Sequence, residues 1–117
     1  MNKYTELSDF EINLLVAQSV LPETQYDVIK QTMDIIQFLV DGSFGYRFFD
    51  PCNNPSDAMP IIIENLISLM ADMSDDGGST WWCASDISNG ITSRYKSNPL
   101  RAAMEVFLRI KDEENEV

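Results

Sequence analysis

From Ile67 to Ala84 the chain reads ISLMADMSDDGGSTWWCA. Residues 67–73 alternate between apolar and polar side chains well enough for a strand, although Met70 interrupts the alternation. Residues 80–84 are rich in residues that favour strands. The polar residues 74–79 between them include two adjacent glycines, as turns commonly do. This stretch therefore predicts a β-hairpin with an acidic turn.

Two helix starts stand on either side of the hairpin. In each, a capping asparagine precedes a proline at the first helical position, where the missing N–H costs nothing; the pairs are Asn54-Pro55 and Asn98-Pro99. The first helix is predicted to reach about Asn65. The second carries an apolar stripe, and its acidic end, residues 112–117, is predicted to fray.

A third helix is predicted near the N-terminus. Ser8-Asp9-Phe10-Glu11 is a capping box, in which the serine and glutamate side chains each accept a hydrogen bond from the other residue's backbone N–H. The helix is predicted from about Asp9 to Val20, because Leu21-Pro22 ends it.

The segment between residues 26 and 49 allows two interpretations. Three runs rich in β-forming residues, with Asp41-Gly42 between the last two, favour antiparallel strands. The apolar residues of 27–40 also fit a helical spacing, and periodicity alone does not decide. A polar loop is predicted from Asn89 to Lys96. We predict one domain over residues 1–117, of the α/β (α+β) class, with the order helix, antiparallel strands, helix, β-hairpin, helix, the helices packing on a small, mainly antiparallel sheet.

Acidic side chains dominate most of the chain. The net charge is −11; residues 1–90 contain 14 acidic and 3 basic side chains, whereas residues 91–117 contain 5 of each. No Lys or Arg lies between Arg47 and Arg94. Such a surface repels nucleic acid phosphates and attracts basic proteins, so we expect no direct nucleic-acid binding. A solvated surface that only keeps the protein soluble is the alternative.

The cysteines and the hydropathy bear on location. No apolar stretch approaches the ~18 residues of a transmembrane helix, and the N-terminus has no apolar signal segment. We expect no membrane association and a location in the cytoplasm, with Cys52 and Cys83 as free thiols; a bridge between them is the alternative.

The residues that most kinds of enzyme catalysis require are missing from this chain. There is no histidine, two cysteines do not make a four-thiolate zinc site, and the glycines form no phosphate-binding motif. Residues 72–77 resemble the first half of a calcium loop, but Cys83 stands where such a loop needs a glutamate. The neighbours Asp75 and Asp76 offer only a weak acid–base pair on a mobile turn. We therefore expect no enzyme, no cofactor and no metal site.

Two sets of residues are candidates for binding. An acidic surface with an exposed tryptophan suits a basic partner protein, since tryptophan is enriched at interface hot spots; its candidate residues are Asp72, Asp75, Asp76, Trp81, Trp82 and Asp86. Adjacent strand residues point to opposite faces, so one indole can enter the core while the other lies outside. The alternative is that helices bury both indoles.

A second set of residues could hold an anion or small ligand with cations and capped helix ends. This set consists of Asn54, Arg94, Lys96, Asn98 and Arg101.

Three motifs resemble those of a phage family. The chain reads LSDFEIN at 7–13, CNNPSDAMPII at 52–62 and NPLRAAM at 98–104, and in this order they resemble the NinX-type proteins of lambdoid phages and prophages. The layout is more weakly similar to small phage α-β-α sandwich proteins. The chain departs from the family pattern in residues 21–50 and at Met59, where a larger aromatic is expected.

The resemblance implies a biological setting. It implies an accessory protein of temperate phages, located in the cytoplasm of the infected bacterium, with no catalytic residues to carry over. We therefore expect a non-enzymatic binding protein for a host or phage protein with a basic surface. Its expected role is to inhibit a nucleic-acid-binding or anti-phage defence protein. Sequestration of a nucleotide signal is the alternative.

Overall fold

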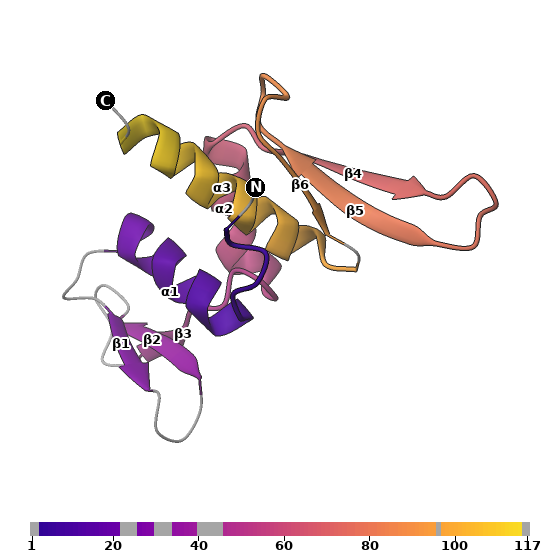
Figure 1. Cartoon of the computed structure of the whole chain (residues 1–117). Helices are drawn as coiled ribbons and strands as arrows, with labels where there is room; N and C mark the ends of the chain where they lie inside the picture. The colour runs from indigo at the N-terminus through magenta and orange to yellow at the C-terminus, as the bar shows by residue number, and fades with distance from the viewer. Residues whose placement is uncertain (1–2, 22–25, 30–33, 40–45, 96, 116–117) are drawn as a thin grey trace.

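The computed structural model describes residues 3–21, 26–29, 34–39, 46–95 and 97–115 (Figure 1). Its elements alternate between helices and short strands, and they are α1 (Asp9–Val20), β1 (Tyr26–Ile29), β2 (Ile35–Leu39), β3 (Tyr46–Phe48), α2 (Pro55–Glu64), β4 (Ser68–Met73), β5 (Thr80–Ser85), β6 (Thr92–Tyr95) and α3 (Pro99–Asn115). The predicted α+β class and the predicted order of helices and strands are confirmed. Residues 27–29 and 35–39 belong to strands, so the helical interpretation of 27–40 is wrong there.

The strands form two separate antiparallel sheets of three strands, where one small sheet was predicted. One has the order β1-β2-β3 and the other the order β4-β5-β6; we call the second the C-terminal sheet. They remain separate because each packs on a different helix: β2 contacts α1, whereas all three strands of the C-terminal sheet contact α3. Figure 1 shows the sheets on opposite sides of the helices. The turn predicted at Asp41-Gly42 lies outside the described residues.

All three predicted helix starts are confirmed. The Ser8 hydroxyl accepts from the Glu11 N–H at 3.1 Å, and the Glu11 carboxylate accepts from the Ser8 N–H at 3.0 Å. The amide oxygen of Asn54 accepts from the N–H of Ser56. The amide oxygen of Asn98 accepts from the N–H groups of Leu100 and Arg101. Local sequence signals therefore fix where the helices begin.

The strand β6 corrects the loop predicted from Asn89 to Lys96. Its residues carry no apolar alternation because the inward side chain is Ser93, whose hydroxyl donates to the buried Glu105 carboxylate at 3.0 Å. A polar partner on α3 thus replaces the apolar contact that a strand pattern normally signals.

The predicted fraying of residues 112–117 is wrong for residues 112–115, which continue α3. The hydroxyl of Tyr4 donates to the Asp112 carboxylate at 2.5 Å, and Lys111 pairs with Glu114 at 3.2 Å. The contact with Tyr4 holds the last turns of the helix against the start of the chain. Residues 116 and 117 lie outside the described part.

Helix α3 occupies the centre of the protein. Every residue from Arg101 to Leu108 is buried, because α1, α2 and the C-terminal sheet surround this part of the helix. The core around it is apolar, and its fully buried side chains include Ile12, Val16, Ala58, Met104 and Phe107. This central helix supports both the hairpin β4–β5 and the start of the chain.

Candidate functional site

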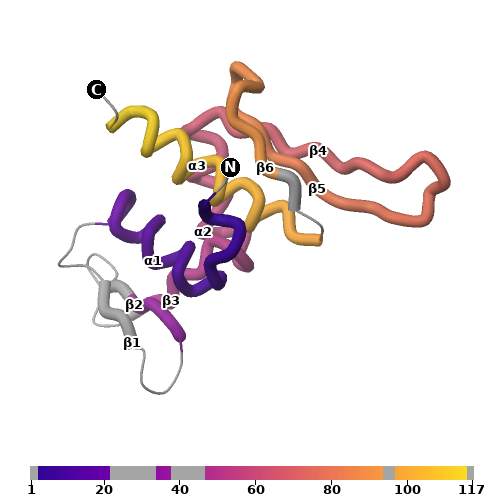
Figure 2. The backbone as a smooth tube through the Cα atoms, viewed as in Figure 1, coloured from indigo at the N-terminus to yellow at the C-terminus, as the bar shows by residue number. Residues whose placement is uncertain are grey.

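The hairpin of β4 and β5 projects beyond the body of the protein. Its pairing runs without a break from Ser68↔Ser85 to Met73↔Thr80. Figures 1 and 2 show the two strands extending away from the three helices. The predicted hairpin is confirmed, and its turn is the most distant part of the C-terminal sheet from the core.

The acidic turn has a defined conformation. The Ser74 N–H donates to the Ser79 carbonyl at 2.8 Å, and Gly77 adopts a left-handed φ of 72° that favours glycine. The Asp76 carboxylate accepts from the Ser74 hydroxyl at 2.6 Å and from the Gly78 N–H at 2.8 Å. These donors hold the pKa of Asp76 below its ordinary value, so the turn keeps its charge.

The two tryptophans lie on opposite faces of the hairpin, as predicted. Trp82 pairs with Ala71 and lies two residues from Ala84, which is buried against α3, so Trp82 is on the α3 side of the sheet. Trp81 pairs with Asp72 on the other face. Both rings are half-buried, so helices do not seal both of them in the core.

A cavity of about 500 Å³ lies at the hairpin, where it passes the start of α3. Both tryptophans contribute to its lining, together with Ala71, Asp72, Met73, Thr80 and Ser97. Apolar side chains and the acidic residue Asp72 therefore meet at this cavity.

Asp86 lies apart from this group. It begins the turn between β5 and β6, at the opposite end of β5 from Thr80, which at about 3.3 Å per residue is roughly 20 Å away. Its carboxylate accepts from the Ile91 N–H at 3.0 Å and from the Ser88 hydroxyl at 2.7 Å. The structure thus places Asp72, Asp75, Asp76 and the two tryptophans on one hairpin, and separates Asp86 from them.

The predicted anion-binding set does not form an open site among the described residues. Asn54 and Asn98 use their amide oxygens to cap α2 and α3. Arg101 is only 3% exposed. Lys96 and the side chain of Arg94 lie outside the described residues. The residues of this set that the structure places therefore serve the fold.

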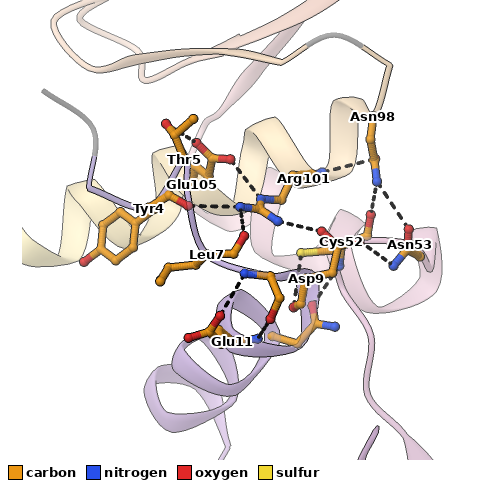
Figure 3. A network of polar contacts seen from close by, with 12 residues as sticks. Tyr4, Thr5, Leu7, Asp9, Glu11, Cys52, Asn53, Asn98, Arg101 and Glu105 are labelled. Carbon is orange, nitrogen blue, oxygen red and sulfur yellow. Dashed lines mark hydrogen bonds and ion pairs between the residues drawn. The ribbon is translucent and has the colours of Figure 1, made fainter. Parts of the chain in front are cut away.

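Arg101 is the centre of a buried polar network (Figure 3). Its guanidinium donates to the Glu105 carboxylate at 2.8 Å and to the Asp9 carboxylate at 2.6 Å. It also donates to the backbone carbonyls of Tyr4 and Leu7, at 2.9 and 2.7 Å. One side chain of α3 thus fixes the start of the chain and the start of α1.

The segment before α2 joins the same network. The Asn98 amide donates to the Cys52 carbonyl at 2.7 Å, and the Cys52 N–H donates to the Asn13 amide oxygen at 3.0 Å. The Asn53 amide donates to the Asp9 carboxylate at 3.2 Å. The three motifs at 7–13, 52–62 and 98–104, distant in the sequence, therefore meet in space.

This convergence agrees with the comparison of the chain with known families. The sequence model of the family described as "Bacteriophage P22, NinX" matches residues 3–111, which span every element from the N-terminal segment to the last turns of α3.

The chain belongs to the NinX family.

This NinX-family chain is therefore a phage accessory protein, as the three motifs implied. No curated protein and no solved structure matches it. The network built from its motifs was not predicted, because residues separated by more than ninety positions, such as Asp9 and Arg101, give no local signal of their contact. The sequence showed only the capping roles of Ser8 and Asn98.

The cysteines of the NinX-family chain are both free. Cys52 is fully buried, and this burial, together with the nearby Asp9 carboxylate, raises the pKa of its thiol well above the ordinary value. Cys83 is half-buried on the same face of the C-terminal sheet as Trp81. The alternative of a Cys52–Cys83 bridge is wrong.

Two kinds of feature are absent from the described part of the chain. Over these residues, no three His, Cys, Asp or Glu side chains gather closely enough to hold a metal ion. None of the described helices has both the length and the apolar character needed to cross a membrane.

Proposed function

We propose that this NinX-family protein acts by non-enzymatic binding to a host or phage protein with a basic surface, and that the β4–β5 hairpin is its binding element. The observation that carries the proposal is the projection of this hairpin, which places Asp72, Asp75 and Asp76 around and beyond Trp81 and Trp82. Charge and aromatic surface are thus presented together.

The electrostatics favour a basic partner. The carboxylates at the hairpin belong to a span of sequence with no Lys or Arg between Arg47 and Arg94. Clustered charge of one sign raises the association rate with oppositely charged surfaces and disfavours partners of the same sign. The hydrogen bonds from Ser74 and Gly78 hold the Asp76 carboxylate in place, which lowers the cost of ordering it on binding.

The apolar groups supply an anchor. Trp82 lines the 500 Å³ cavity next to Met73, which is exposed at the end of β4. Tryptophan is prominent among the residues that contribute most to binding free energy. Burial of its ring contributes most where the charged groups around it exclude water. A partner that inserts an apolar side chain beside its own Lys or Arg residues would match this surface.

The chemistry of the hairpin supports binding over catalysis. Asp72, Asp75 and Asp76 are all exposed. A general acid or base usually has its pKa adjusted by burial or by a close charge, whereas the donors to Asp76 favour its ordinary ionised form. A nucleic-acid-binding surface, including that of an anti-phage defence factor, is a suitable target because it is already built to attract negative groups. We propose inhibition of such a protein as the biological effect.

The experiment is affinity capture from phage-infected bacteria, with partners identified by mass spectrometry. The test variant combines Asp72→Asn, Asp75→Asn and Asp76→Asn, which removes three charges but keeps the acceptor oxygen that the turn uses. The control combines Glu6→Gln, Glu113→Gln and Glu114→Gln, exposed residues elsewhere on the surface. We expect a captured protein to be lost with the test variant and retained with the control. Equal capture by both variants would contradict the proposal.

A further inference from the structure

The outer edge of β4 is an open edge of the C-terminal sheet. Among the described residues, β5 is the strand that pairs with β4, so the other edge of β4 has no strand beside it. The strand is six residues long, and all of its residues except Leu69 are exposed. Figure 1 shows it on the projecting hairpin, which extends away from the three helices. Another chain can therefore approach this edge from solvent.

The register of the hairpin decides which backbone groups point outward. In an antiparallel pair, residues whose N–H and C=O face the partner strand alternate with residues whose groups face away from it. The Ser74 N–H donates to the Ser79 carbonyl at 2.8 Å, directly after the last strand pair. Counting back from Ser74, the N–H and C=O groups of Leu69, Ala71 and Met73 face the outer edge.

The Met73 N–H supports this assignment. It donates to the Asp72 carboxylate at 2.8 Å instead of to β5. Asp72 thus occupies one outward donor at the turn end of the edge. The N–H groups of Leu69 and Ala71 lie farther along the edge, together with the outward carbonyl groups. A row of such groups is a template for pairing with another strand.

The opposite edge of the same sheet is protected. The guanidinium of Arg109, on α3, donates to the carbonyl of Thr92, on β6, at 2.5 Å. Natural proteins also protect sheet edges with prolines, lysines and β-bulges. The strand β4 reads SLMADM, which contains neither proline nor lysine, and its pairing with β5 runs without a break. The sheet therefore has one protected edge and one edge that is suited to strand pairing.

The charges along the edge favour a basic segment. Asp72 on β4 and Asp75 and Asp76 in the turn are all exposed, and residues 68–85 contain no Lys or Arg. A second copy that paired through the same edge would bring a second hairpin without cations, from a chain whose net charge is −11. Lys or Arg side chains on an added strand would instead complement these carboxylates.

The cavity at the hairpin offers apolar contacts to such a strand. Ala71, Met73 and Trp82 contribute to its lining, and they lie on the α3 side of the hairpin. Residues that stand opposite each other in an antiparallel pair share a face of the sheet. A residue bonded to Ala71 would therefore place its side chain on the α3 side, near the cavity, and its neighbours would lie on the other face, near Asp72.

We propose that the outer edge of β4 binds an extended segment of a partner protein as an antiparallel strand, with apolar side chains on the α3 side and Lys or Arg on the other side. Main-chain hydrogen bonds to Leu69 and Ala71 would supply affinity, and the alternate side chains would supply specificity. This inference rests on the proposed function, because it states how the hairpin recognises its basic partner.

Three synthetic peptides test this proposal with the full chain. Each has about eight residues, the length of an ordinary strand, and alternates valine with lysine. The first is unmodified, the second is methylated on the backbone nitrogens of its valines, and the third on the backbone nitrogens of its lysines. The two methylated peptides have the same charge and composition. With valines on the α3 side, the valine N–H groups bond to β4, whereas the lysine N–H groups face solvent.

Fluorescence anisotropy of the labelled peptides measures their binding. The unmodified and lysine-methylated peptides are expected to bind, and the valine-methylated peptide is expected to bind at least about tenfold more weakly, because it loses its hydrogen bonds to the edge.

Two variants at Ala71 locate the binding. Ala71→Pro removes an outward N–H that takes no part in pairing with β5, and proline is tolerated at such edge positions. Ala71→Thr, the control, keeps the N–H and favours a strand. We expect the unmodified peptide to bind at least about tenfold more weakly to Ala71→Pro and as tightly to Ala71→Thr as to the parent. Thermal unfolding checks both variants, and the methylated peptides test the parent protein independently of them.

Several results would overturn the proposal. They are no binding of the unmodified peptide, equal or reversed binding of the two methylated peptides, and full binding by a folded Ala71→Pro variant. A dimer in sedimentation analysis that Ala71→Pro abolishes would assign the edge to a second copy instead.

The variant neutralised at Asp72, Asp75 and Asp76 separates this inference from the proposed function. It is expected to bind the unmodified peptide more weakly but to keep the preference between the methylated peptides; undiminished binding would contradict the basic character of the segment. If affinity capture depends on these three carboxylates but is unchanged by Ala71→Pro, the hairpin remains the binding element and strand addition is excluded.

Discussion

Replacement of Arg101 by methionine is expected to remove much of the stability of this protein. Methionine fills similar apolar space but donates no hydrogen bond. The change takes away the cationic partner of Glu105, which is 0% exposed, and the donors to the Tyr4 and Leu7 carbonyls. Asp9 is less affected, because its side chain is 45% exposed and water can solvate it.

The size of this loss of stability follows from the burial of both Arg101 and Glu105. Removing one member of a buried ion pair costs about 3–5 kcal/mol, because the other charge stays in a poorly solvated site. Each buried carbonyl that loses its donor costs about 1–3 kcal/mol, although these costs overlap when the structure relaxes. We expect a total loss of about 3–5 kcal/mol, against the roughly 5–15 kcal/mol that stabilises a typical domain.

Urea denaturation followed by fluorescence of Trp81 and Trp82 measures this loss. The control is Lys111→Met, which breaks the pair with Glu114; these side chains are 37% and 56% exposed, so the expected change is within about 0.5 kcal/mol. The double variant Arg101→Met with Glu105→Met removes both charges and is expected to be more stable than Arg101→Met alone. A loss below about 1 kcal/mol for Arg101→Met would refute the structural role of the network.

Three further predictions concern a turn, a thiol and the end of α3. Donors from Ile91 and Ser88 lower the pKa of Asp86 below its ordinary value of 3.8. The ionised carboxylate therefore stabilises the folded state above that value, and this stabilisation is lost as the pH falls through the lower pKa of the folded state. The destabilisation caused by Asp86→Asn, measured by urea denaturation across the pH range, should therefore shrink in acid. Burial raises the pKa of the Cys52 thiol. A thiol reagent should therefore modify Cys83 in the native protein and Cys52 only on unfolding, as peptide mapping would show. Rapid modification of Cys52 in the native protein would contradict this. Asp112→Ala removes the acceptor of the Tyr4 hydroxyl and should lower the free energy of unfolding by about 1–2 kcal/mol, whereas an unchanged urea midpoint would mean that this end of α3 contributes nothing.

Local signals made the helices and the hairpin predictable. Ser8, Asn54 and Asn98 cap helices through bonds that span two or three residues, and such bonds are visible in the sequence. The opposite orientation of Trp81 and Trp82 follows from the period of two along a strand. These features depend on neighbours in the chain, and the structure confirms them.

Features set by distant contacts were not predictable. Strand β6 depends on the bond between Ser93 and Glu105 of α3, and the ordered end of α3 depends on Tyr4, more than one hundred residues away. Arg101 was a candidate ligand-binding residue because it is a cation near the capped start of a helix, but its partners lie at the other end of the chain. The left-handed backbone at Leu66 has no sequence signal, since leucine rarely adopts it.

Asp86 shows how sequence distance misleads in a sheet. It is ten positions from Asp76, close enough in the sequence to suggest one acidic cluster. An intervening extended strand places the two residues at opposite ends of β5. The same strand that separates them leaves Asp72 paired with Trp81 on the hairpin.

Site-specific photocrosslinking in phage-infected bacteria tests most directly whether the hairpin contacts a basic partner. A photoreactive amino acid replaces either Thr80, exposed at the start of β5, or Phe48, exposed on β3. The expected result is an adduct from position 80 only, to a protein segment rich in Lys or Arg, which disappears when Asp72, Asp75 and Asp76 are changed to Asn. No adduct from position 80, or an adduct that persists in the neutralised hairpin, would contradict the account.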